Sequence, residues 1–374
     1  MASAVNSAVV GLDIGGAGIK AALVDAAGQA AVARAPLELW RAPNALASTV
    51  AAVVGRLAGA DTPVALTMTA ELADVFADKR EGVLAILDAA AIALGERRLR
   101  VLSTDGELLE LDRARAAPLR CAAANWLASA LLVSRALPDA ILVDCGGTTT
   151  DLIPIVAGRV AARGRTDLER LLEGELLYTG ALRTNVAAIL SAVSIGGRPC
   201  PVSAELFAIA ADAHLLRGNL TPLQCTCSFP DGRGSSPGEV RARLARVVCA
   251  DPPQLSEADL QGIAAAVERA QVDAIAGALA RVAARARPGA EILALGTGAF
   301  LVRAAARRLG LALCPESRWP PPLRGPGGEV APAAALSALG AHGLAPQRST
   351  LASKTDVVSA PSPLGAASAP PPRP

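Results

Sequence analysis

Two Asp-x-Gly-Gly segments hold the residues that are best suited to chemistry in this chain. In VGLDIGGAGIK (10–20) Asp13 precedes the glycines and Lys20 follows them, and in ILVDCGGTTTDLIPI (141–155) Asp144 precedes and Asp151 follows. Glycines let backbone N–H groups approach an anion closely, and threonine hydroxyls and a lysine add donors. Carboxylates at strand ends suit a hard cation such as Mg²⁺, held directly or through water. The pair predicts a polyphosphate site, whereas one such segment alone is more typical of an ordinary tight turn.

Each residue type in these segments has an expected role. The catalytic residues are expected to be Asp13, Lys20, Asp144 and Asp151, with Asp13 and Asp144 also holding the magnesium. The phosphates are expected to contact Gly15, Gly16, Gly146, Gly147, Thr148, Thr149 and Thr150.

The two segments also belong to a longer internal repeat. VGLDIGGAGIKAALVDAAGQ (10–29) and ILVDCGGTTTDLIPIVAGRV (141–160) each run from an apolar strand through Asp-x-Gly-Gly into a second strand that closes on Ala-Gly. Two hairpins of matching design, one near the start and one near the middle, indicate a duplicated domain. Each copy would supply one Gly-rich turn.

A third Gly-rich turn follows a strand-like run in EILALGTGAF (291–300), at Gly296, Thr297 and Gly298. In order and spacing the three turns resemble the two phosphate loops and the adenosine loop of the actin, sugar-kinase and Hsp70 superfamily. The resemblance implies an α/β fold in which duplicated ribonuclease H-like domains surround a central cleft, and it adds the third turn to the binding residues.

The alternation of strand-like and helical patterns along the chain supports an α/β architecture. Strands are expected at 8–14, 19–25, 63–68, 140–144, 151–156 and 291–295. Helices are expected at 45–59, 82–95, 122–135, 166–173, 183–194, 202–214, 256–285, 299–309 and 332–341. The segments 225–240 and 318–332 are rich in Gly and Pro and are expected to be loops.

These patterns predict three parts of the chain. Residues 1–138 form the first domain, to which 318–345 return, and residues 139–317 form the second. Residues 346–374, which end in SAPSPLGAASAPPPRP, are expected to be a disordered Ala/Pro-rich tail, because they cannot bury enough apolar surface to offset the entropy of ordering.

Longer motifs narrow the resemblance to one branch. VALTMTAELADVFADKREGV (64–83), AAANWLASA (122–130) and ARGRTDLERLLEGELLYTGALRT (162–184) resemble hydantoinase/oxoprolinase-like proteins of the tetrahydromethanopterin-linked C1-transfer pathway. The branch is similar to the ether-forming synthase of methanofuran biosynthesis, and the resemblance covers about residues 8–345. It implies a transferase that joins an aminomethylfuran diphosphate to the phenol of a tyramine or tyrosine derivative and releases diphosphate, with Mg²⁺ or a similar divalent cation.

Several residues of the matching segments have two interpretations. Under the resemblance Asp144, Asp151 or Glu71 could take the phenol proton, and the residues alone do not choose between them. Glu71 could also cap the following helix, Arg163 and Arg165 could bind an anion or face solvent, and Tyr178 could contact substrate or pack in the core.

Two other classes of function fit the superfamily. An ATP-dependent small-molecule kinase or a hydantoinase/oxoprolinase-type hydrolase component is favoured by the third turn, and would consume ATP. A nucleotide-binding regulator without turnover is disfavoured by the intact Asp13 and Asp144. Fold alone does not decide between them.

The composition limits partners and compartment. The 36 basic and 34 acidic residues give a net charge of +2, so there is no electrostatic case for binding nucleic acid or a membrane surface. No apolar run is long enough to cross a membrane, and the N-terminus lacks a signal-peptide pattern. Seven scattered cysteines predict reduced thiols in the cytoplasm, with a metal site around Cys225, Cys227, Cys249 and His214 as the weaker alternative. The expected partners are small molecules, and a homo-oligomer stays open.

Overall fold

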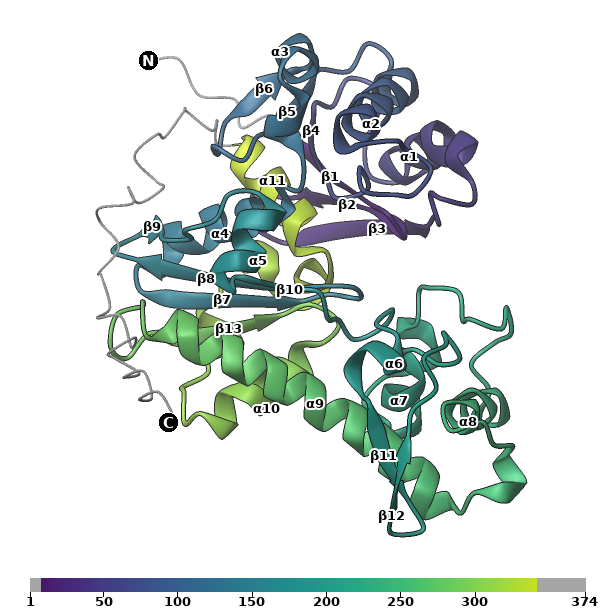
Figure 1. Ribbon diagram of the computed structural model, residues 1–374. Helices are drawn as coiled ribbons and strands as arrows, with labels where there is room; N and C mark the ends of the chain where they lie inside the picture. Colours follow the sequence, from purple (N-terminus) through teal and green to yellow (C-terminus); the bar gives the residue numbers. More distant parts are fainter. Residues whose placement is uncertain (1–7, 342–374) are drawn as a thin grey trace, which may run out of the picture.

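The computed structural model describes residues 8–341, which fold into two β-sheets flanked by helices and a mainly helical unit beside the second sheet (Figure 1). The tail expected at 346–374 and the last residues of the segment 318–345 lie outside the described residues. Across residues 8–341, no helix combines the length and apolar character needed to cross a membrane.

The first sheet has six strands in the order β3-β2-β1-β4-β5-β6. Strand β1 runs antiparallel to β2 and parallel to β4, and it is buried at every position but its last. The bounds are β1 Val10–Gly15, β2 Gly18–Val24, β3 Ala30–Pro36, β4 Val64–Met68, β5 Leu99–Leu102 and β6 Leu108–Glu110. β3, β5 and β6 were not among the expected strands, because each is short or alanine- and arginine-rich and has little β-propensity of its own.

The second sheet repeats the centre of the first. Its order is β10-β8-β7-β13, with β9 pairing beside β8, and β7 runs antiparallel to β8 and parallel to β13. The bounds are β7 Ala140–Cys145, β8 Thr150–Val156, β9 Arg159–Val160, β10 Leu176–Leu177 and β13 Glu291–Leu295. This shared order confirms the duplicated α/β fold.

Helices α4 and α11 lie between the two sheets (Figure 1). The Ser337 hydroxyl of α11 donates to Val9 O at 2.6 Å and accepts from Val24 N at 2.8 Å, so this late helix is fastened to the first sheet. α4 packs on the second sheet as well as on α11, and one apolar cluster runs through both helices and both sheets. The helices that flank the two sheets are α1 Leu46–Gly55, α2 Lys79–Leu94, α3 Leu111–Ala116, α4 Asn125–Ala136, α10 Ala299–Arg308 and α11 Ala331–Ala341.

A helical unit is inserted between β10 and β13. Its longest helix is α9, which continues under the second sheet (Figure 1). The helices here are α6 Val186–Ile189, α7 Ala210–Leu216, α8 Pro237–Arg246 and α9 Glu257–Ala283, with a hairpin of β11 Ala192–Ile195 and β12 Arg198–Pro201. The helix α5 Asp167–Glu173 precedes β10 and contacts it.

Two expected helices are wrong in this unit, and one was missed. The range 183–194 contains only the short α6 and most of β11, because Val193 is buried as a strand residue and a Gly-Gly turn closes the hairpin. In 202–214 only the last residues are helical. α8 begins inside the expected loop 225–240, where Pro237 follows a Ser236–Glu239 capping box.

Candidate functional site

The three Gly-rich turns meet at one cleft of about 1010 Å³. Since the two hairpins come from equivalent positions of the two sheets, they contribute walls to this cleft from both halves of the fold. The expected site residues that line it are Asp13, Gly15, Gly16, Lys20, Gly147, Thr148, Thr149, Tyr178, Gly296 and Thr297.

In the first hairpin, Asp13 and Lys20 are directly opposed across β1 and β2. Side chains of directly opposed residues lie on the same face of a sheet, which brings a carboxylate and an ammonium group together at the cleft. Asp13 is buried and its Oδ1 has no hydrogen-bond partner. Burial raises the pKa of Asp13, the charge of Lys20 opposes this rise, and the charge of Asp151 adds to it.

In the second hairpin, Asp144 and Asp151 are directly opposed across β7 and β8. Burial and the charge of Asp151 raise the pKa of Asp144 to about 7. Asp151 does not line the cleft, because its Oδ1 pairs with Arg170 Nη1 at 2.7 Å. Arg170 is itself buried, with its guanidinium 4.2 Å from the centre of the Trp126 ring. Asp144 is half-buried and is not among the residues that line the cleft; its carboxyl group lies against Gly296 of the third turn, and the charge of Asp13 contributes to its raised pKa.

The second Gly-rich turn is held by the segment that follows β10. Ala181 N donates to Gly146 O at 2.9 Å, and Arg183 N donates to Gly147 O at 2.8 Å. Thr150 is buried and its hydroxyl donates to Thr179 O at 2.7 Å, so this threonine fastens the loop and does not line the cleft. A Cβ at Gly180 would lie 2.5 Å from Thr148 N, so the close approach requires glycine there.

The third turn packs directly on the end of β7. Gly298 N donates to Cys145 O at 2.8 Å, and Gly296 has φ +82°. A Cβ at Gly296 would lie 2.3 Å from Cys145 O and 2.4 Å from Asp144 Oδ1. Gly298 faces Cys145 and does not line the cleft, whereas Gly296 and Thr297 do. The turn therefore positions Asp144 as well as closing the cleft.

The carboxyl groups of Asp13 and Asp144 are oxygen donors of the kind that a hard cation such as Mg²⁺ prefers. The buried Asp13 Oδ1 has no partner, and Asp144, whose pKa burial and the charge of Asp151 raise to about 7, supplies a second carboxyl group that a bound cation would ionise. Within residues 8–341, no group of three or more His, Cys, Asp or Glu side chains is arranged to hold a metal ion. Asp13 and Asp144 could therefore hold a magnesium ion only with water completing its coordination.

Three of the expected substrate residues lie away from the cleft. Glu71 is buried and neither carboxylate oxygen has a partner; burial raises its pKa to about 7. Arg163 pairs with Glu173 at 3.6 Å, and Arg165 pairs with Asp105 at 3.3 Å. Neither arginine lines the cleft, because these ion pairs hold them elsewhere.

One wall of the cleft was not expected from the sequence. It consists of two segments that a hydrogen bond from Ser228 N to Glu38 Oε1 joins at 3.2 Å: Glu38, Trp40 and Arg41 from the loop after β3, and residues 226–230 from the helical unit. Because β3 was not predicted as a strand, no residue pattern indicated that the loop after it lies at the cleft. The only sequence signal was Trp40, one of three tryptophans in the chain.

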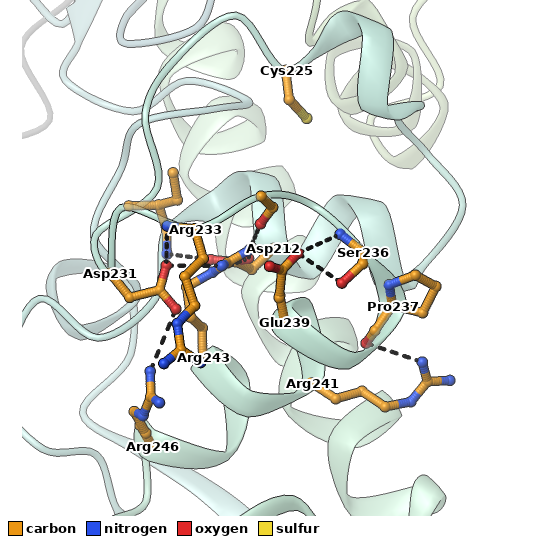
Figure 2. Close-up of polar contacts among 12 residues, drawn as sticks. Asp212, Cys225, Asp231, Arg233, Ser236, Pro237, Glu239, Arg241, Arg243 and Arg246 are labelled. Carbon is orange, nitrogen blue, oxygen red and sulfur yellow. Dashed lines mark hydrogen bonds and ion pairs between the residues drawn. The ribbon is translucent and has the colours of Figure 1, made fainter.

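Arg243 of α8 lies beside the wall 226–230, and Figure 2 shows it together with Asp212 and Asp231. Its guanidinium is fully buried, pairs with Asp212 at 2.8 Å and Asp231 at 3.0 Å, and donates to Gly234 O at 3.0 Å. It also lies 4.1 Å from the centre of the Phe229 ring, which lines the cleft. One side chain therefore ties the wall to α7 and α8.

The cysteines and histidine of the helical unit form no metal group among the described residues. His214 is buried, with Nε2 2.8 Å from Gln271 Oε1, and Gln271 Nε2 donates to Thr179 Oγ1 and Gly180 O, each at 2.9 Å. His214 therefore connects through Gln271 to the segment 179–180, which packs against the second Gly-rich turn.

The solved structures with a similar backbone arrangement include the following two. Nucleotide-free acetone carboxylase gives a TM-score of 0.49 at 11% identity, over 88% of this chain and 69% of that one. The ethanolamine utilization protein of Carboxydothermus hydrogenoformans gives 0.43 at 15% identity, over 88% of both chains.

Comparison with curated sequences finds two archaeal relatives with the same name, (4-{4-[2-(gamma-L-glutamylamino)ethyl]phenoxymethyl}furan-2-yl)methanamine synthase. The protein of Methanocaldococcus jannaschii is 40% identical over 198 residues, which are 53% of this chain and 59% of the relative. That of Methanococcus vannielii is 39% identical over 137 residues, 37% of this chain and 61% of the relative. The matches thus span less than two thirds of each relative.

The hydantoinase/oxoprolinase family model matches residues 63–337, which include the second and third Gly-rich turns and most of the cleft. The chain therefore belongs to the hydantoinase/oxoprolinase family.

Proposed function

We propose that this protein is a cytoplasmic transferase of methanofuran-type cofactor biosynthesis. It joins an aminomethylfuran diphosphate to the phenol of a tyramine or tyrosine derivative, forms an ether and releases diphosphate. The observation that carries the proposal is the cleft into which both Gly-rich hairpins project, with Lys20 beside the first, in a chain 40% identical to a synthase whose name describes such an ether.

In the proposed step the phenol oxygen bonds to the furanylmethyl carbon as the bond from that carbon to the diphosphate oxygen breaks. The bonding electrons leave with the diphosphate, and the phenol proton passes to a carboxylate. Asp144, Asp151 and Glu71 do not line the cleft, so Asp13 is the acid of the expected set that can take this proton directly.

The leaving group is stabilised by charge and by backbone donors. Lys20 and the turns at Gly15–Gly16 and Gly147–Thr149 line the same cleft, so they can neutralise the charge that develops on the bridging oxygen. A magnesium ion held by Asp13 and Asp144 through water would supply further neutralisation when bound. Arg170 keeps Asp151 paired, which limits the negative charge near the diphosphate.

The test is incubation of the purified protein with the aminomethylfuran diphosphate, Mg²⁺ and tyramine or γ-glutamyltyramine, followed by mass spectrometry. The expected products are the ether and one diphosphate for each ether, without nucleotide. The Asp13→Asn variant serves as the control for background alkylation. Absence of ether with every phenol would overturn the proposal.

A second candidate is an ATP-dependent kinase or hydrolase component. The observation in its favour is that Gly296 and Thr297 of the third turn line the same cleft as the two phosphate loops. ADP formed in proportion to product would favour this candidate over the transferase.

A further inference from the structure

We propose that the mouth of the cleft is a subsite for the α-amino-acid end of the phenolic substrate, in which Arg183 binds the carboxylate and Glu38 the ammonium group. The inference rests on the proposed function and assigns to Arg183 and Glu38 the recognition of the γ-glutamyl group that the name of the curated relatives contains. A phenolic amine that carries a γ-glutamyl group presents this zwitterion, and plain tyramine does not.

Arg183 is a cation held in place without an acidic partner. Its guanidinium lies 4.5 Å from the centre of the Trp40 ring, and both residues line the cleft. In residues 8–341 no carboxylate lies within ion-pairing distance of it, whereas Arg34 pairs with Glu329 at 2.8 Å and Arg41 with Glu38 at 3.2 Å. Stacking on the ring fixes the planar donor group before a ligand arrives, which reduces the entropy lost on binding a carboxylate.

Both sides of this mouth are fastened to the phosphate loops. Leu39 N donates to Gly16 O at 3.1 Å, which sets Glu38 and Trp40 beside the first loop. Arg183 N donates to Gly147 O at 2.8 Å, which sets Arg183 beside the second. A substrate held at the mouth therefore extends from the loops where the diphosphate would lie, as the second substrate of the proposed reaction must.

Glu38 supplies the opposite charge at the same place. Its Oε1 accepts from Ser228 N at 3.2 Å, which joins the loop after β3 to the wall 226–230, and its side chain is 17% exposed. Burial raises the pKa of the Cys227 thiol; the charge of Arg183 acts against this and the charge of Glu38 adds to it, so both charges reach one point of the wall. A cation and an anion that flank one opening without pairing with each other match a zwitterion.

Three phenols separate the two contacts: N-butyryltyramine, N-glutaryltyramine, which adds the carboxylate to the same chain, and γ-glutamyltyramine, which adds the ammonium group as well. The wild type is expected to prefer them in rising order of kcat/KM. Each charge-assisted contact should contribute about 10-fold or more. Arg183→Gln should remove the preference for N-glutaryltyramine over N-butyryltyramine. Glu38→Gln should keep that preference and remove the further gain of γ-glutamyltyramine over N-glutaryltyramine.

Arg303→Gln is the matched control, because Arg303 lines the cleft from α10 and, among the described residues, forms neither an ion pair with Glu38 nor a cation–π contact with Trp40. Arg303→Gln should keep the order of preference among the three phenols, even where it lowers kcat/KM for all of them. Variants at Arg183 and Glu38 that slow all three phenols by the same factor would overturn the subsite, as would a wild type without preference.

Calorimetry with γ-glutamyltyramine alone separates this inference from the proposed function. Binding that weakens by about 10-fold in Arg183→Gln, in a protein that forms no ether, would keep the subsite and reject the transferase. Ether formation with unchanged preferences in both variants would keep the transferase and reject the subsite.

Discussion

Lys20 and Asp151 occupy the same position in the two halves of the fold. Lys20 is the cross-strand partner of Asp13, and Asp151 is the cross-strand partner of Asp144. The duplicated hairpins have thus diverged at one place, where the first has a cation and the second an acid that pairs with Arg170 at 2.7 Å. Charge at the cleft is therefore asymmetric, with its ammonium group on the side of the first loop.

Lys20→Ala is expected to slow chemistry more than it weakens binding. Charge on the bridging oxygen appears mainly in the transition state, so kcat should fall by about 100- to 1000-fold while KM for the furan diphosphate changes less. Steady-state kinetics of diphosphate release would measure both. Lys79→Ala is the control, since Lys79 pairs with Asp167 at 2.8 Å outside the cleft lining. A rise in KM with kcat unchanged would assign Lys20 to ground-state binding only.

Asp13→Asn and Asp144→Asn should each remove most activity and leave the fold intact. The amide keeps the size of the side chain but loses the charge that would hold a metal. Activity measured across a Mg²⁺ titration, with circular dichroism for the fold, would test this. Asp112→Asn controls for loss of charge, because that side chain is 98% exposed. Near wild-type turnover at limiting Mg²⁺ would contradict the metal role.

Gly296→Ala should be far more damaging than Gly289→Ala. Both glycines have φ +82°, so each substitution carries the same backbone strain of about 1 kcal/mol. The new Cβ at 296 would also collide with Asp144 and Cys145, whereas nothing lies within 4 Å of a Cβ at 289. Chemical denaturation and activity would be compared for the pair. Equal losses would mean that the third turn does not position Asp144.

Glu71→Gln should flatten the dependence of stability on pH. Burial raises the pKa of Glu71 to about 7. A raised pKa in the folded state means that its contribution is fully present below the unfolded pKa of about 4.5 and is lost as pH rises through about 7. The loss amounts to about 3 kcal/mol for the wild type. Urea denaturation at pH 5 and pH 8 should show a smaller difference for the variant, and parallel curves would contradict this.

Arg243→Lys should destabilise the fold and raise KM together. Lysine cannot reproduce the planar contacts with Asp212, Asp231 and Gly234 O, and a broken buried network costs about 3–5 kcal/mol. Arg241→Lys on the same helix (Figure 2) is the control, because its pair with Glu257 is exposed and should cost less than about 0.5 kcal/mol. A stable Arg243→Lys protein with unchanged KM would show that the wall 226–230 holds its place without this arginine.

The sequence alone determined the duplicated hairpins, the three Gly-rich turns and their order. These features depend on local chemistry, since a strand that ends in Asp-x-Gly-Gly is specified by a few adjacent residues. The hairpin β11–β12 and the helix α8 also had local signals. The Gly-Gly pair of the hairpin follows just after the expected helix 183–194, which took in most of β11, and the capping box of α8 lies inside the expected loop 225–240.

Only the tertiary structure decided which acids and cations face the cleft. Asp13 and Asp144 look equivalent in the sequence, yet the first lines the cleft and the second lies beneath the third turn. Arg163 and Arg165 are held in ion pairs elsewhere, while Arg183, close by in the sequence, stacks on Trp40 from the other half of the fold. Contacts between residues more than a hundred positions apart depend on how two sheets pack, and no local pattern of residues encodes that packing.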